Sequence, residues 1–167
     1  MVFDRKQPGN IWVISDTHLR AGQILPEAFT KKVNREDIVI HLGDFVSFDI
    51  AEQINNIATL EAVSGNCDPP SIRNIYPARK IIEINGKRVG LIHGWGPSLD
   101  TLNQVKYEFD DKVDLALFGH THVAHHSKFN GVVYFNPGSL TQSRKGSNSF
   151  GLIHFKEGIR GEIIDID

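Results

Sequence analysis

Five short motifs of this sequence hold carboxylate, amide and imidazole side chains at spacings that suit one shared site. They are Asp16-Thr17-His18, Gly43-Asp44, Gly65-Asn66-Cys67-Asp68, His93-Gly94 and Gly119-His120-Thr121-His122. The candidate metal ligands in them are Asp16, His18, Asp44, Asn66, His93, His120 and His122. This mixture of oxygen and nitrogen donors suits borderline or hard divalent ions such as manganese, zinc, iron, cobalt or nickel. So many ligands exceed the needs of one tetrahedral ion, but they suit two ions that share a carboxylate.

A pair of divalent ions has a specific chemical use. Two ions about 3.5–4 Å apart can hold a hydroxide and clamp a phosphoryl group for in-line attack. The ligand set therefore indicates metal-dependent hydrolysis of a phosphate ester.

Taken alone, most of these motifs have an ordinary structural explanation. Gly-Asp is more often a turn with a capping aspartate, and Gly-Asn-Cys-Asp is usually a turn. A single histidine at the end of a strand is more often half-buried and hydrogen-bonded than a ligand. Gly-His-Thr-His is more specific, because two histidines at i and i+2 point the same way from an extended segment. The order of the five motifs and their shared position favour a site.

The shared position is the end of an apolar run of strand length. These runs cover residues 11–15, 38–42, 60–64, 89–92 and 115–118. Their composition is typical of strands covered on both faces, and the glycines that follow favour strands over helix segments. Sites in open α/β sheets form at the carboxyl ends of strands. We therefore expect the motifs to meet at one edge.

Helical patterns separate the early strands. Apolar spacing predicts helices over residues 25–33, 50–60 and 99–109. Asn85-Gly86 predicts a hairpin between residues 80–84 and 87–92, and Asn130-Gly131 is a second hairpin signal. The chain from residue 124 onward is mostly strand and turn. The pattern predicts an α/β fold in which two sheets pack together with helices outside.

Length and composition narrow the class of protein. A chain of 167 residues suits a single domain over 1–167. A formal net charge of −2 gives no strong nucleic-acid signal. The single cysteine fits a reducing compartment. The N-terminal ten residues have no apolar run of signal-peptide type, and no segment has the length for a membrane span. We expect a cytoplasmic protein without a membrane partner.

The ordered motifs resemble those of the calcineurin-like metallophosphoesterase superfamily. The short chain, the cysteine of Gly-Asn-Cys-Asp and the segment Asn136-Pro137-Gly138-Ser139 are similar to its small prokaryotic phosphodiesterase branch. The resemblance extends from Asn10 to about residue 155. It implies a four-layer α/β/β/α sandwich, two divalent metal ions with manganese favoured, and a small phosphate-ester substrate. It also allows a homo-oligomer.

The resemblance also implies how the ligands divide. Asp16, His18 and His122 would hold the first metal. Asn66, His93 and His120 would hold the second metal, and Asp44 would bridge both. In this interpretation the catalytic residues are Asp44, Asn66, His93 and His120, which support attack by the shared hydroxide and neutralise the charge that develops on the phosphoryl group.

One position departs from the wider family. Many members have a histidine after the motif asparagine, where it assists the leaving group, and this chain has Cys67. A neutral thiol is a poor donor and carries no positive charge. We interpret Cys67 as a small packing residue and expect substrates with good leaving groups, or assistance from Asp68 or a water.

Other polar residues receive structural interpretations. Of the remaining histidines, His41 and His154 are expected in strands, and His125 and His126 at exposed strand or turn positions. Arg144 could bind a substrate phosphate, but we expect a solvated loop there.

Two other functions compete with the phosphodiesterase. The first is a protein-binding scaffold on the same fold, because the small retromer subunit is similar to this branch. The second is a phosphomonoesterase. Retention of every ligand type favours catalysis over the scaffold, and the short chain predicts an open site without a cap domain.

Overall fold

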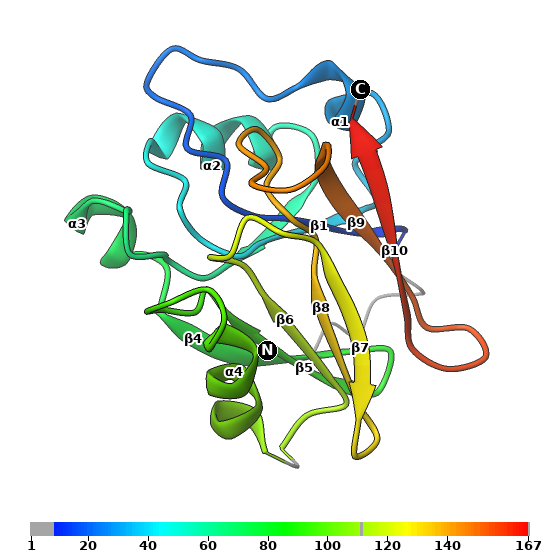
Figure 1. The fold of residues 1–167 in the computed structure, drawn as a ribbon. Coiled ribbons are helices and arrows are strands. Elements are labelled where there is room, and N and C mark those ends of the chain that lie inside the picture. Colours follow the sequence, from blue (N-terminus) through cyan, green and yellow to red (C-terminus); the bar gives the residue numbers. More distant parts are fainter. Residues whose placement is uncertain (1–8, 111, 167) are drawn as a thin grey trace.

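The computed structural model describes residues 9–110 and 112–166, and their strands form two five-stranded sheets (Figure 1). One sheet has the order β10-β9-β1-β2-β3. Its strands are β1 (Ile11–Ile14), β2 (Ile38–His41), β3 (Thr59–Ala62), β9 (Asn148–His154) and β10 (Arg160–Ile166). The other has the order β4-β5-β6-β8-β7. Its strands are β4 (Arg79–Ile84), β5 (Lys87–Ile92), β6 (Leu115–Phe118), β7 (His125–Phe129) and β8 (Val132–Asn136).

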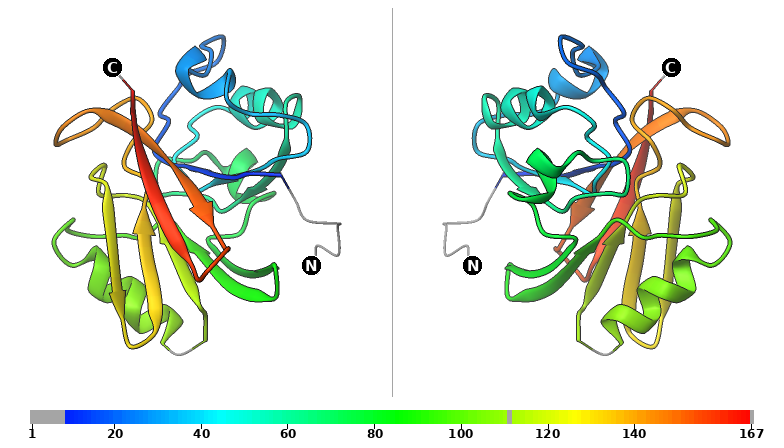
Figure 2. Two further views of the ribbon diagram at one scale, coloured as in Figure 1. Left: turned by 90° about the vertical axis from the view of Figure 1, so that its right-hand side faces the viewer. Right: turned by 90° about the vertical axis from the view of Figure 1, so that its left-hand side faces the viewer.

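Helices cover the outer faces of both sheets. The described helices are α1 (Glu27–Thr30), α2 (Phe48–Asn55), α3 (Pro70–Arg73) and α4 (Thr101–Phe109). Helices α1 and α2 pack on the β1 sheet, and α4 packs on the β6 sheet (Figure 2). The predicted four-layer α/β/β/α sandwich is therefore confirmed. In the part of the chain that the structure describes, no helix is long and apolar enough to cross a bilayer. The signal-peptide expectation concerns residues 1–10, of which residues 1–8 lie outside this part.

Strand β1 shows why the central strands read as continuous apolar runs. Ile11 and Val13 point into the cluster between the two sheets. Trp12 and Ile14 point into the cluster beneath α1 and α2. Successive side chains of a strand face opposite ways, so a strand with layers on both sides needs apolar residues at every position. Strand β6 alternates in the same way between the central cluster and the cluster beneath α4.

The Phe135 ring of one sheet packs directly against strands of the other sheet. Phe135 of β8 is fully buried in the cluster between the sheets. A Cβ added at Gly151 of β9 or at Gly161 of β10 would overlap this ring. The two glycines therefore leave the space that the ring occupies.

The parallel strands deliver the motifs to one edge. Strands β1, β2 and β3 are parallel neighbours, and so are β5 and β6. Parallel neighbours end at the same edge of a sheet, so the loops that follow them leave together. The predicted hairpins at Asn85-Gly86 and Asn130-Gly131 join β4 to β5 and β7 to β8.

The helix boundaries differ from the prediction. Helix α1 is shorter than residues 25–33 and begins after Pro26, because a proline disfavours helical backbone in the residue before it. Helix α2 begins earlier than residue 50, because the Ser47 side chain accepts a hydrogen bond from the Asp49 backbone N–H at 3.3 Å. Helix α4 begins after Leu99, which is 94% exposed. The short helix α3 was not predicted.

Candidate metal centre

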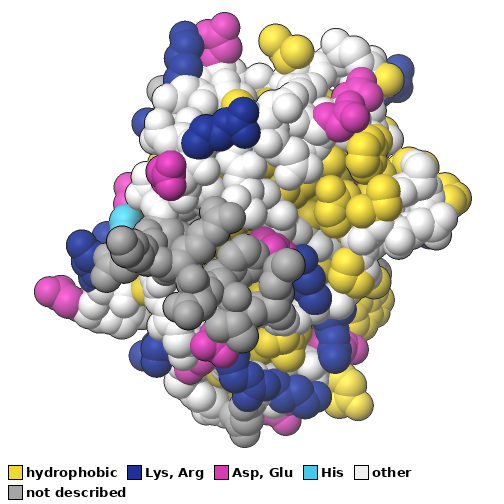
Figure 3. Space-filling model, turned by 180° about the vertical axis from the view of Figure 1, so that it is seen from behind, with side chains coloured by type: hydrophobic (Ala, Val, Ile, Leu, Met, Phe, Trp, Pro, Cys, Tyr) yellow, Lys and Arg dark blue, Asp and Glu magenta, His cyan; other side chains and the backbone are white. Residues whose placement is uncertain are grey.

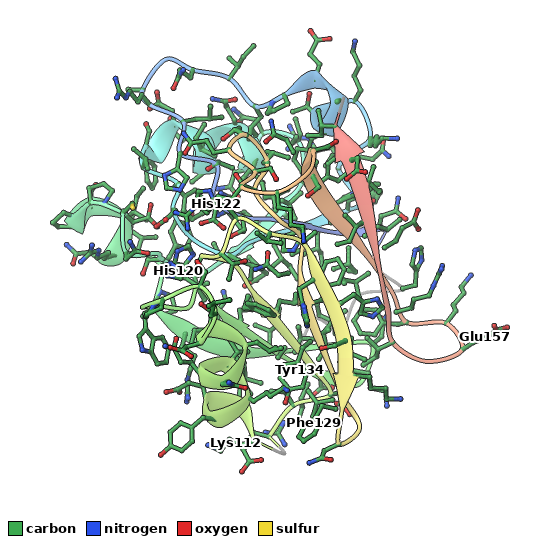
Figure 4. The ribbon with its side chains drawn as sticks, in the orientation of Figure 1. Lys112, His120, His122, Phe129, Tyr134 and Glu157 are labelled. Carbon is green, nitrogen blue, oxygen red and sulfur yellow. The ribbon has the colours of Figure 1, made fainter. Side chains whose placement is uncertain are left out.

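The loops after β1, β2, β3, β5 and β6 bring all seven predicted ligands to one edge of the sandwich. Figure 4 shows His120 and His122 at this edge, far from Lys112 and Phe129 at the other end of the β6 sheet. Most of the ligands are buried, whereas Asn66 is exposed at the rim. The site therefore opens to solvent on one side.

A first group of donor atoms surrounds the Asp16 carboxylate. Asp16, His18, Asp44 and His122 each place a donor atom within 4.8 Å of the others. Asp16 Oδ1 lies 3.2 Å from His122 Nε2, and the His122 and His18 Nε2 atoms are 3.1 Å apart. Asp44 Oδ2 lies 3.4 Å from His18 Nε2. Two carboxylates and two imidazoles thus converge as they would around a cation.

A second group converges on the Asn66 amide oxygen. Asn66 Oδ1 lies 3.1 Å from His93 Nε2 and 3.2 Å from His120 Nδ1. Asp44 Oδ2, which belongs to the first group, also lies 3.3 Å from His93 Nε2. Asp44 is therefore the carboxylate that stands between the two groups, as the bridging assignment requires.

In three of the imidazoles, the ring nitrogen that points away from the cluster (the outer nitrogen) is hydrogen-bonded to a backbone carbonyl. The contacts are His93 Nδ1 to Leu42 O at 2.6 Å, His120 Nε2 to Gly96 O at 2.7 Å and His122 Nδ1 to Gln142 O at 2.7 Å. A carbonyl only accepts, so the outer nitrogen of each ring donates. The inner nitrogen of a neutral ring then carries the lone pair, which is the arrangement of a metal-ligating histidine.

Asp16 has a buried oxygen that the protein itself does not satisfy. Its Oδ2 accepts from Ser15 Oγ at 2.7 Å and from the His120 backbone N–H at 3.0 Å. Its buried Oδ1 has no hydrogen-bond partner among the described residues, because the His122 Nε2 atom at 3.2 Å carries a lone pair in the neutral ring. Burying such an oxygen is costly without a partner. A cation supplies that partner, so these residues fit a bound metal.

The backbone of the site is strained at the ligands themselves. Asp16, His18, Asp44, His120 and His122 have φ angles of 52°, 45°, 59°, 69° and 58°. Positive φ is uncommon outside glycine. Such conformations cost of order 1–3 kcal/mol each and persist where the surrounding structure holds them. Their concentration at one edge indicates that the loops are shaped for the side chains they carry.

Asp68 holds the Asp44 loop in place. One of its carboxylate oxygens accepts from the backbone N–H of Asp44 at 2.9 Å and of Gly65 at 2.7 Å. The other accepts from the Val46 backbone N–H at 2.9 Å. Both oxygens are therefore engaged as acceptors, and Asp68 is a positioning residue. The expectation that Asp68 assists a leaving group stays a prediction.

His41 is hydrogen-bonded to the loops that follow β1 and β2. It is fully buried, and its Nδ1 accepts from the Gly43 backbone N–H at 3.1 Å. Its Nε2 therefore carries the hydrogen and donates to Thr17 Oγ1 at 3.1 Å. Thr17 Oγ1 donates in turn to the Asp44 carbonyl at 3.3 Å. Burial lowers the pKa of His41 to about 3, so the neutral ring holds this arrangement.

The Asn136–Ser139 segment supports the site from the other side. Ser139 Oγ donates to the Asp16 carbonyl at 2.7 Å, and Asn136 Nδ2 donates to the Gly119 carbonyl at 2.9 Å. Thr141 Oγ1 donates to the Thr17 carbonyl at 2.6 Å. The segment therefore fixes the backbone of the first and last motifs.

Cys67 is exposed beside Asn66, so the interpretation as a packing residue is wrong. Its backbone N–H donates to Asp44 Oδ1 at 2.8 Å and leaves Oδ2 facing the histidines. Partial loss of solvent around the sulfur and the nearby Asp44 carboxylate raise the pKa of its thiol. The thiol therefore stays protonated at neutral pH and gives little assistance to a leaving group.

The other singled-out residues lie outside the two groups. His154 pairs with Glu162 across β9 and β10 at 3.1 Å, and His125 Nε2 contacts Ser127 Oγ at 2.7 Å. His126 is exposed on β7. Arg144 is exposed, and its backbone N–H donates a hydrogen bond to the His122 carbonyl. Its guanidinium contacts Ser98 Oγ at 3.4 Å.

The charges of the site shift the pKa values of its members. Burial disfavours the charged form of His93, but the Asp44 and Asp16 carboxylates outweigh burial and raise its pKa to about 9. Burial likewise opposes ionisation of Asp44, yet His93 holds its pKa well below the usual range. The His93 site thus attracts a positive charge, which a proton or a metal ion can supply.

Comparisons with known proteins agree with this geometry. The model of the calcineurin-like phosphoesterase superfamily domain matches residues 10–158. A probable metallophosphoesterase of Methanothermobacter thermautotrophicus is 34% identical over 161 residues, which cover 94% of this chain and 90% of that protein. The Entamoeba histolytica Vps29 structure with zinc has a TM-score of 0.69 at 23% identity, covering 95% of this chain and 100% of that chain. An archaeal phosphodiesterase structure has a TM-score of 0.68 at 22% identity, covering 93% and 100%.

The two-sheet sandwich and the cluster of candidate metal ligands at its strand ends agree with these matches. The chain belongs to the calcineurin-like phosphoesterase superfamily, as the motif order predicted. Its activity class is that of a metal-dependent phosphoesterase.

Proposed function

We propose that the protein is a phosphodiesterase that uses two divalent ions, with manganese the favoured metal. Asp16, His18 and His122 hold one ion, and Asn66, His93 and His120 hold the other. The observation that carries this proposal is the position of Asp44, whose Oδ2 lies 3.4 Å from His18 Nε2 and 3.3 Å from His93 Nε2. One oxygen that faces both groups is what a shared pair of ions needs.

The chain contributes position and charge. When bound, the two ions supply a nucleophile at neutral pH and neutralise charge on the phosphoryl oxygens. Asp44 is fixed through its other oxygen by the Cys67 N–H, and three imidazoles are oriented by backbone carbonyls. At the open rim, Asn66 Oδ1 faces His93 and His120, and its Nδ2 donates to Cys67 Sγ at 3.4 Å. Because the Cys67 thiol is a poor proton donor and the Asp68 oxygens accept backbone hydrogen bonds, diesters with good leaving groups are the preferred substrates.

Two observations support a small diester as the substrate. The archaeal protein with the same fold is described as a phosphodiesterase. Figure 3 shows Lys and Arg side chains alongside Asp and Glu on the face seen from behind. The formal net charge of the chain is −2, whereas proteins that bind long nucleic acids are usually strongly basic.

A hydrolysis panel tests this proposal. Manganese- or zinc-loaded protein should hydrolyse bis(p-nitrophenyl) phosphate faster than p-nitrophenyl phosphate. Asp44→Asn should lower the diester rate by at least about a hundredfold, since the shared carboxylate is lost. The matched control is Asp110→Asn, an exposed aspartate after α4, which should keep the wild-type rate. Preference for the monoester would show a phosphomonoesterase, and full activity of Asp44→Asn would contradict the proposal.

A protein-binding scaffold is the second candidate. The likeness to Vps29, with a TM-score of 0.69, is the observation that favours it. A scaffold function predicts no hydrolysis of either ester by metal-loaded protein. Turnover that depends on Asp44 would exclude a scaffold without activity.

A further inference from the structure

A pocket of about 390 Å³ opens beside the second ligand group. Asn66 and His93 belong both to its wall and to the candidate metal centre. The rest of its wall comes from α3, β4, β5, α4 and the loop after β5. Its volume lies within the range of roughly 300–1,000 Å³ that is typical of small-molecule sites. A phosphate bound at Asn66 would have one of its ester arms within reach of this pocket.

An exposed tryptophan lines the pocket. Trp95 is 45% exposed, whereas the chain's other tryptophan, Trp12, is 5% exposed. Trp95 stands between Gly94 and Gly96, whose φ angles are 102° and 67°. The Gly96 carbonyl accepts from His120 Nε2 at 2.7 Å. The Trp95 ring thus belongs to a loop whose backbone is hydrogen-bonded to the candidate metal ligand His120.

Two of the charged residues that line the pocket form an ion pair, and Arg73 does not belong to it. Arg79 of β4 pairs with Glu108 of α4 at 2.6 Å. Arg73 of α3 is exposed and donates to the Asn66 carbonyl at 2.7 Å. Among the described residues, Arg73 has no carboxylate partner, so no such group neutralises its positive charge at the pocket wall. Anionic esters are drawn toward such a charge.

We propose that this pocket is a substrate subsite that binds a planar aromatic ring on the alcohol side of a phosphodiester. The ring stacks on Trp95 while the phosphate binds at Asn66 and His93, and Arg73 attracts the anion. This inference rests on the proposed phosphodiesterase function and adds the substrate class to it. A ring is favoured over a flexible polar chain because the wall combines Trp95 with the apolar Ile92 and Ala78.

Calorimetry with two small esters tests the subsite without requiring turnover. Phenyl phosphate and ethyl phosphate present the same anion to the metal centre and differ in the ring. Metal-loaded wild-type protein should bind phenyl phosphate about tenfold more tightly, the scale expected for one aromatic stacking contact. Trp95→Ala should remove this preference, and Trp95→Phe should retain most of it. Tyr107→Ala, which removes another exposed aromatic residue from α4, should behave as the wild type.

The controls separate the subsite from the proposed function. Binding of inorganic phosphate should be equal in the wild type and Trp95→Ala, because the metal ligands are untouched. Wild-type hydrolysis of bis(p-nitrophenyl) phosphate with an unchanged ring preference in Trp95→Ala would overturn the subsite alone. Equal binding of the two esters by the wild type would also overturn it. Absence of diester hydrolysis by the metal-loaded wild type would instead count against the phosphodiesterase.

Discussion

Asp44 is the residue on which the account of the site depends. Its two oxygens have different partners: the Cys67 N–H on one side, and His18 and His93 on the other. The motif order predicted that this residue and the six other candidate ligands would converge, because each follows a strand and strand ends meet at an edge. The hydrogen-bond partners of each candidate ligand could not be predicted from the motif order, since they come from loops that are distant in the sequence.

Asp68 and Cys67 illustrate that limit. Both belong to the Gly-Asn-Cys-Asp motif, and each has contacts with the Asp44 loop that were not predicted. Asp68 accepts three backbone hydrogen bonds, including one from Asp44 across 24 positions of the chain. Cys67 is exposed because the motif turns outward at the rim. An aspartate at the end of a turn motif often accepts hydrogen bonds from backbone N–H groups. The position of Asp68 in its motif could therefore have indicated its contacts with the backbone.

His93 gives a pH prediction for the metal-free protein. Its pKa rises from 6.5 to about 9 on folding, so the folded protein retains a proton that the unfolded chain releases in this interval. The stabilising contribution is full below pH 6.5 and is lost as the pH rises toward about 9. Urea unfolding of chelator-treated protein across this range should show the decline, and His93→Gln should flatten it. An equal decline in His93→Gln would contradict the assignment.

At the scale of elements, the site is made by turns that follow short strands. The strand runs were predicted to within about two residues, because layers on both faces demand apolar side chains. The helix bounds were predicted less well, because the Ser47 cap and the restriction before Pro26 act over single residues. Helix α3 has only four residues and therefore lacks an apolar period from which it could be recognised.

Gly43 tests whether the close approach of these turns matters. It has a φ of 95°, and a Cβ added there would lie 2.7 Å from Gly65 N and 2.8 Å from His93 Nδ1. Gly43→Ala should lower the free energy of unfolding by roughly 2–4 kcal/mol, from backbone strain and the overlap together. It should also weaken metal binding. Gly86→Ala is the matched control, because its φ is 72° and its Cβ would meet nothing within 4 Å.

Chemical denaturation of both variants separates the two contributions. Gly86→Ala reports the cost of positive φ alone, of order 1 kcal/mol. If Gly43→Ala cost no more than Gly86→Ala, the packing of the β2 and β3 turns would not be the reason for glycine at this position.

At the scale of the whole molecule, the sandwich brings two sheets to one site. The β1 sheet supplies the loops that carry Asp16, Asp44 and Asn66, and the β6 sheet supplies those that carry His93 and His120. Two sheets with outer helices could be predicted from the alternation of helices, strands and hairpins. The strand order could not, because β9 pairs with β1 across more than half of the chain.

Phe135 tests how firmly the sheets are joined. Its ring is fully buried between them against Gly151 and Gly161. Phe135→Ala should lower the free energy of unfolding by about 3–5 kcal/mol, because it leaves a cavity that the glycines cannot fill. Phe129→Ala removes a ring that is 51% exposed and should cost less than about 1 kcal/mol. Equal losses in the two variants, measured by urea unfolding, would contradict the role assigned to Phe135.

The number of metal ions bound per chain distinguishes a two-metal site from a one-metal site or none. Protein purified without chelator, loaded with manganese or zinc and freed of excess metal, should contain two ions per chain by elemental analysis. His122→Ala should reduce the content toward one ion by removing a ligand of the first group, and Asp44→Asn should weaken both sites. A wild-type content of one ion or none, with the protein folded and the metal in excess, would contradict the two-metal account.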